Sequence, residues 1–69
     1  MATFELIDQE YIELNKLLKI ENLVETGGEA KFLIKNGEAI VNDAIETQVR
    51  KKLRKGDIVR FFDEIIEII

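Results

Sequence analysis

The sequence predicts an α+β domain in which two helices pack on one face of a small, mainly antiparallel sheet. One observation is a pair of apolar stripes at helical spacing, formed by Leu14, Leu17 and Leu18 and by Ala30, Leu33 and Ile34. A second is the change of period from residue 38 on, where short β-type segments alternate with turn residues. The third is the length. The 69 residues contain no linker and no internal repeat, which predicts a single domain over residues 1–69.

The N-terminal segment TFELI alternates and contains β-forming residues, which predicts a short strand over Thr3–Ile7. A helix follows within YIELNKLLKIENL, where good helix formers surround the first leucine stripe. The sequence leaves the start of this helix open. Asp8 would serve as an N-cap, but Ile12 would equally extend the preceding strand.

The second helix has clearer boundaries. Residues 26–29 match the capping box, in which the Thr26 hydroxyl and the Glu29 carboxylate each satisfy an unpaired backbone amide. Gly37 suits the left-handed residue that follows the last turn. A hairpin turn at Asn36-Gly37 is the alternative, and the helical stripe in front of it favours the helix.

The C-terminal half predicts strands separated by tight turns. EAIVN and AIETQV are β-type segments around Asn42-Asp43, residue types that tolerate positive φ. LRKGD supplies a glycine turn, and IVRFF and EIIEII predict two closing strands around Asp63-Glu64.

The composition argues against several functions. The chain has neither histidine nor cysteine, so the usual general base, thiol nucleophile and metal ligands are missing. The carboxylates are scattered, and no calcium loop or nucleotide-binding loop is present. We therefore expect no enzymatic activity, no cofactor and no metal. No apolar run approaches the roughly 20 residues of a membrane span, and no signal peptide is evident, so we expect no membrane partner.

The net charge of −4 hides a strong polarity along the chain. Residues 1–30 carry seven acidic and two basic side chains, whereas residues 31–60 carry eight basic and four acidic ones. Within the basic part, Lys31 and Lys35 share one helix face, and RKKLRK at residues 50–55 is interrupted only by Leu53, which we expect in the core. Each basic group alone is typical of solvated surface. If they meet in space, they form one surface for a polyanion.

Two glycines in the first turn of the second helix require an explanation, because glycine in a helix costs about 1 kcal/mol relative to alanine. Bare glycines would let a phosphate approach the unpaired, partly positive amides at the helix start. The alternative is that they allow a tight turn between the helices, and the two explanations are compatible. The candidate RNA-binding residues are Thr26, Gly27, Gly28, Lys31, Lys35, Arg50, Lys51, Lys52, Arg54 and Lys55.

Base stacking is not expected to dominate, because Phe32, Phe61 and Phe62 lie in apolar contexts that predict core positions. Contacts with the backbone and shape of a folded RNA fit these residues better.

The order and spacing of these motifs are similar to a known family. LLKIENLVETGGEAKFLIKNGEAIVND, followed by ETQVRKKLRKGDIVRF, resembles the S4-type RNA-binding domain, and especially its short stand-alone bacterial branch. The resemblance covers about Leu14 to Phe62. It implies a two-helix αL-type motif on a small sheet, a cytoplasmic location, and structured RNA of the ribosomal or tRNA class as the partner. Lys31 matches the basic position after Ala30, Thr26 stands where serine is usual, and the run from Arg50 to Lys52 falls where relatives present basic side chains.

The first functional hypothesis is thus a non-enzymatic module that binds structured RNA, either free or in a ribosomal particle. A second is a protein-interaction adaptor that uses the acidic face or an edge strand near Ile65–Ile69. A third is a targeting subunit that acts in trans with an RNA-modifying or repair enzyme.

Overall fold

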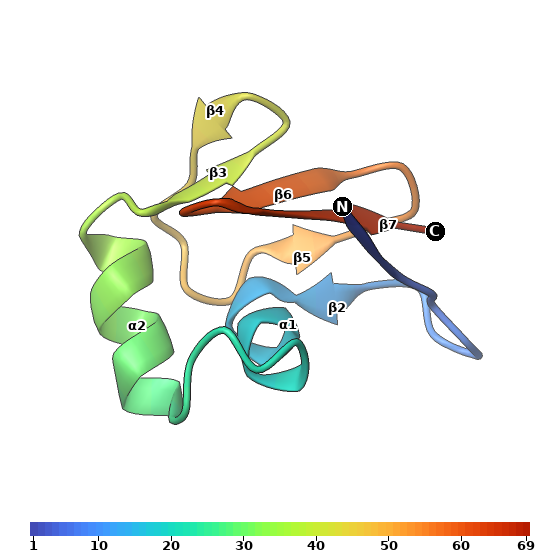
Figure 1. The fold of residues 1–69 in the computed structure, drawn as a ribbon. Coiled ribbons are helices and arrows are strands. Elements are labelled where there is room, and N and C mark those ends of the chain that lie inside the picture. Colours follow the sequence, from blue (N-terminus) through green and yellow to red (C-terminus); the bar gives the residue numbers. More distant parts are fainter.

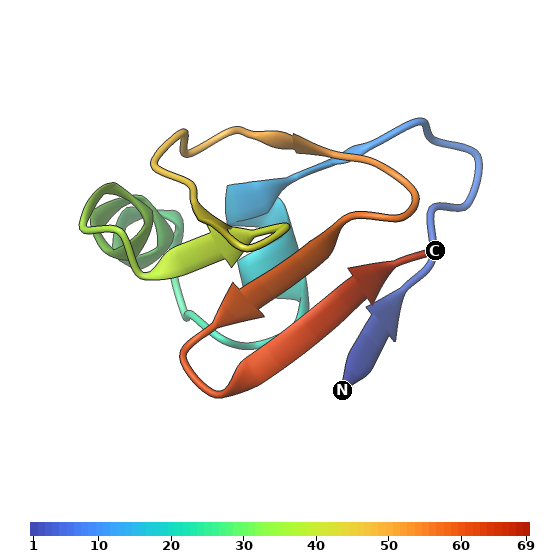
Figure 2. The same ribbon diagram turned by 90° about the horizontal axis from the view of Figure 1, so that it is seen from above.

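The computed structural model describes residues 1–69 and confirms the α+β class (Figure 1). A five-stranded sheet has the order β1-β7-β6-β3-β4, and a separate two-stranded ribbon joins β2 to β5. Both helices lie on one side of the sheet in Figure 1, and the view from above shows α1 behind the strands and α2 at the edge, beside β3 (Figure 2). The helices are α1 (Leu14–Ile20) and α2 (Gly27–Lys35), and the strands are β1 (Ala2–Phe4), β2 (Ile12–Glu13), β3 (Ala39–Val41), β4 (Ala44–Ile45), β5 (Lys52–Leu53), β6 (Ile58–Phe61) and β7 (Glu64–Ile68).

The sheet is mainly antiparallel, with one parallel pair. β6 pairs antiparallel with β7 and β3, and β3 pairs antiparallel with β4, whereas β1 runs parallel to β7. The N-terminal strand is thus present, but it ends earlier than the predicted Thr3–Ile7. Because β1 covers one side of β7, the proposal of an edge strand at Ile65–Ile69 is wrong.

The core lies between the sheet and the helices and contains 14 buried residues, all of them apolar. Both predicted helical stripes contribute to it, with Leu33 only partly buried. Leu53 is also fully buried, as expected from its position inside the basic run. The alternation along β6, where Val59 and Phe61 are buried and Ile58 and Arg60 are exposed, turns one face of the sheet towards the helices.

The start of α1 differs from both sequence-based alternatives. Asp8 does not cap the helix, and Ile12 belongs to the separate strand β2 rather than to an extended β1. Glu13 occupies the N-cap position without a side-chain hydrogen bond. The backbone of residues 49–51 takes over this role: the Leu14 amide donates to the Lys51 carbonyl at 2.9 Å and the Asn15 amide to the Val49 carbonyl at 3.1 Å.

The connection between the helices turns at Asn22, not at the glycine pair. Asn22 has φ 60°, and the Leu23 amide donates to the Leu18 carbonyl at 2.9 Å, which closes the end of α1 in a Schellman arrangement. Gly27 and Gly28 do not have positive φ. The interpretation that they allow a tight inter-helix turn is therefore wrong.

Both ends of α2 follow the prediction. The Glu29 amide donates to the Thr26 hydroxyl at 3.1 Å, and the Glu29 carboxylate accepts from the Glu25 amide at 2.7 Å. At the other end Gly37 has φ +82°, and its amide donates to the Ile34 carbonyl at 3.0 Å. The hairpin alternative at Asn36-Gly37 is thereby excluded.

The β-hairpins use left-handed residues. Asn42 and Asp43, with φ of 51° and 68°, connect β3 to β4 as expected. The following strand is shorter than the predicted AIETQV segment, since β4 ends at Ile45. The closing hairpin turns at Phe62-Asp63 rather than at Asp63-Glu64, and Phe62 has φ 54°.

Two of the three phenylalanines expected in the core are exposed. Phe61 is 2% exposed, whereas Phe32 is 64% and Phe62 57% exposed. Phe32 lies on the solvent side of α2, because it is two residues from Ala30 and Ile34, roughly half a turn away. Phe62 is exposed because it lies in the turn that connects β6 to β7.

Candidate nucleic-acid interface

A surface depression of about 440 Å³ lies between α2 and the segment that precedes β5. Figure 1 shows this segment passing between α2 and the start of α1. Four predicted site residues meet here, although they are up to 23 positions apart in sequence. The depression is lined by Asn15, Gly27, Lys31, Lys35, Val49 and Arg50.

Local structure explains this convergence. Gly27, Lys31 and Lys35 are spaced by four residues and form one stripe along α2. Arg50 lies in a turn closed by a hydrogen bond of 3.2 Å from the Lys51 amide to the Gln48 carbonyl. Because the carbonyls of this same segment hold the first amides of α1, the fold fixes Arg50 opposite the α2 stripe. We call this depression, with its three cations Lys31, Lys35 and Arg50, the basic depression.

The fold itself does not require glycine at the start of α2. A Cβ atom added at Gly27 would meet no atom within 4 Å, and one added at Gly28 would lie 3.9 Å from the Thr26 hydroxyl oxygen. Neither backbone is left-handed. Alanine would therefore fit at both positions. Glycine lowers the stability of the helix here, and no packing contact compensates for this loss.

The cations of the basic depression have no acidic partner. The structure contains one ion pair, Lys16–Glu13 at 3.6 Å. Two nearby carboxylates accept hydrogen bonds from backbone amides, Glu29 from Glu25 and Glu46 from Gln48. No ion pair therefore neutralises the three cations of the basic depression, despite the net charge of −4.

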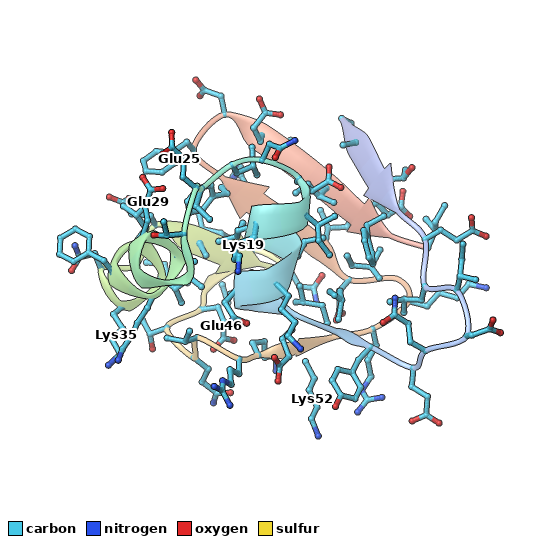
Figure 3. The ribbon with its side chains drawn as sticks, turned by 90° about the horizontal axis from the view of Figure 1, so that it is seen from below. Lys19, Glu25, Glu29, Lys35, Glu46 and Lys52 are labelled. Carbon is cyan, nitrogen blue, oxygen red and sulfur yellow. The ribbon has the colours of Figure 1, made fainter.

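Figure 3 shows where labelled charged side chains lie. Lys35 and Lys52 project from one side of the molecule, with Glu46 between them, whereas Glu25 and Glu29 lie on the other side of α2. A polyanion can thus approach the lysines without passing these two carboxylates.

The other predicted residues do not line the depression. Thr26 is engaged as the N-cap of α2, and Gly28 precedes Glu29 in the first turn. Lys51 is half-buried. Lys52 and Arg54 extend outward from the ribbon, and Lys55 is exposed in the turn before Gly56.

The sequence analysis did not select Asn15 or Tyr11. The Asn15 side-chain oxygen is buried and has no hydrogen-bond partner, although the residue lines the depression. Tyr11 lies beside Lys52 and Arg54, whose charged groups are 5.0 and 5.5 Å from the centre of its ring. The register of β2 against β5 brings Tyr11 to the basic run, and this pairing has no clear sequence signal.

The structure shows no group of three or more acidic side chains arranged to hold a metal ion. Neither helix is long and apolar enough to cross a membrane.

Comparison with known proteins places this geometry in a family. The model of the S4 domain family matches residues 4–69, and the chain belongs to this family. The predicted resemblance is thereby confirmed, and it extends beyond the segment from Leu14 to Phe62 on which it was based.

Individual relatives share the fold and much of the sequence. The chain is 38% identical to "Putative RNA-binding protein YbcJ" of Escherichia coli over 69 residues, which cover 100% of this chain and 99% of the relative. It is also 38% identical over 53 residues to "Probable ribosome maturation protein RlbA" of Bacillus subtilis, covering 77% of this chain and 75% of the relative. The solution structure of E. coli YbcJ, described as revealing an αL motif involved in RNA binding, has a TM-score of 0.75 and covers 100% of this chain and 87% of that one.

Proposed function

We propose that this protein is a non-enzymatic module that binds structured RNA through the phosphate backbone. The observation that carries the proposal is the basic depression, where Lys31, Lys35 and Arg50 converge beside Gly27 without an acidic partner. The names of the E. coli and B. subtilis relatives support RNA as the ligand class and ribosomal RNA, in ribosome assembly, as the target. Such a target implies a cytoplasmic location.

The geometry suits a phosphate more than a base edge. Lysine and arginine provide charged donors for phosphate oxygens, and Arg50 has the planar fork that binds two of them at once. The unpaired amides in the first turn of α2 lie beside these cations, and Gly27 leaves them uncovered. Contacts of this kind position a folded RNA without reading its sequence.

Fluorescence anisotropy with a labelled ribosomal RNA hairpin tests the proposal at about 50 and about 200 mM monovalent salt. If about five phosphates are contacted, log Kd should change with log salt with a slope of about 4 to 5. The double variant Lys31→Glu/Arg50→Glu should weaken binding about 100-fold, the combined effect of two charged hydrogen bonds of about 1.5 kcal/mol each.

The matched control is Lys19→Glu/Arg60→Glu, which changes the net charge equally. Lys19 is on α1, and Arg60 is on the sheet face that points away from the helices. The control should lose far less affinity than the depression variant. Equal losses in the two variants would mean that net charge rather than this site determines binding, and no binding by the wild type at low salt would refute the proposal.

A further inference from the structure

Tyr11 is the one aromatic side chain that contacts the basic run. Continuing the register of β2 and β5, in which Ile12 pairs with Leu53, places Tyr11 opposite Arg54. The Lys52 ammonium lies 5.0 Å and the Arg54 guanidinium carbon 5.5 Å from the centre of the tyrosine ring. Both distances are within the range of cation–π contacts.

The ring is held in a defined position. Ile12 and Leu53 are buried and anchor both strands of the ribbon, and Tyr11 itself is half-buried. Neither Lys52 nor Arg54 pairs with a carboxylate. The ribbon therefore presents a pre-oriented aromatic ring beside two cations that form no ion pair within the protein.

Tyr11 also borders a surface depression. It has a volume of about 310 Å³ and is lined by Gln9, Glu10, Ile12, Glu13 and Lys16, together with Tyr11 itself. Glu13 is paired with Lys16 at 3.6 Å, whereas Glu10 forms no ion pair. A base that entered this depression would lie beside the tyrosine ring, where its amino groups could donate hydrogen bonds to the Glu10 carboxylate.

We propose that Tyr11, Lys52 and Arg54 bind an unpaired nucleotide of the RNA by stacking its base on the tyrosine ring. This inference rests on the proposed function, because the basic depression would hold the adjoining RNA helix. Arg50 and Arg54 are four residues apart, at most about 13 Å of extended chain, so one RNA can reach both places. The preferred ligand is then a helix with a bulged or flanking unpaired nucleotide, rather than a fully paired helix.

The test compares two RNA hairpins that are identical except for one bulged nucleotide in the stem. Anisotropy titrations would use the wild type, Tyr11→Leu, Tyr11→Phe and, as a matched control on a distant exposed aromatic residue, Phe62→Leu. Circular dichroism would first show that each variant is folded. Because Tyr11 is the sole tyrosine and the chain lacks tryptophan, intrinsic tyrosine fluorescence reports this ring alone, after correction for absorption by the RNA.

We expect the wild type to bind the bulged hairpin about tenfold more tightly than the paired one, within the range for base–aromatic stacking. Tyr11→Leu should abolish this preference, whereas Tyr11→Phe and Phe62→Leu should keep it. The bulged RNA should also quench the tyrosine fluorescence more strongly than the paired RNA. Equal affinity of the wild type for both hairpins, or a preference that survives Tyr11→Leu, would overturn the inference and leave the proposed function intact. Binding to neither hairpin would overturn both.

Discussion

The substitution Gly27→Ala should change stability and RNA affinity in opposite directions. Gly27 is the first residue of α2 and lines the basic depression. If the fold required this glycine, its replacement would lower the free energy of unfolding. If the glycine serves a ligand instead, its replacement would raise the free energy of unfolding. The structure predicts the second behaviour.

The expected gain in stability follows from the space around Gly27. An added methyl group meets no atom within 4 Å, and the backbone is not left-handed, so alanine introduces no strain. It also reduces the conformational freedom of the unfolded chain. The free energy of unfolding should rise by about 0.4 to 1 kcal/mol. For a domain of this size, such a gain raises Tm by about 2 to 8 °C.

The expected loss of affinity follows from the same methyl group. It would stand where a phosphate oxygen must approach to accept a hydrogen bond from the first amides of α2. A hydrogen bond to a charged group contributes about 1.5 to 3 kcal/mol, so losing one should weaken RNA binding about tenfold or more.

The assay combines urea unfolding with anisotropy titration of the same protein samples. Gly28→Ala is the control, because its added Cβ also fits but Gly28 does not line the depression. It should show a similar gain in stability with a smaller loss of affinity. Destabilisation by Gly27→Ala would mean that the fold needs this glycine. Stabilisation with unchanged affinity would show that no ligand approaches these amides.

Three further substitutions test the local structure, each by urea unfolding followed by circular dichroism. Thr26→Ala should destabilise the protein by about 1 kcal/mol through loss of the N-cap, and Thr26→Ser, which keeps the hydroxyl, should not. Gly37→Ala should lower the free energy of unfolding by about 1 to 2 kcal/mol, because φ is +82° at this position. A stabilised variant would contradict the left-handed conformation of Gly37. Asn42→Ala should cost about 2 kcal/mol, since the Asn42 side chain accepts from the Ile58 amide and donates to Asp57, both at 2.9 Å. A loss as small as that of a surface substitution would show that these two bonds contribute little.

Periodicity identified both helices because each buries a narrow stripe against the sheet, and that stripe repeats at the helical period. The capping box at Thr26 and the left-handed Gly37 were predictable for a related reason. Their hydrogen bonds connect residues a few positions apart, so local sequence specifies them. The exposure of Phe32 was also predictable from periodicity, since Phe32 lies off the stripe of Ala30 and Ile34, and its apolar neighbourhood in sequence was misleading. The exposure of Phe62 was not predictable, because it depends on the left-handed turn between β6 and β7.

The sequence by itself determined the fold class, the family and the set of basic side chains available for a polyanion. Only the tertiary structure decided that Arg50 lies beside Lys31 and Lys35, and that Tyr11 lies beside Lys52 and Arg54. Both arrangements depend on β5 and the segment before it. The carbonyls of this segment accept hydrogen bonds from the first amides of α1, and β5 itself pairs with β2. These are backbone contacts between residues about 40 positions apart. Backbone amides and carbonyls are common to nearly every residue type, and therefore side-chain identity carries little information about such pairings.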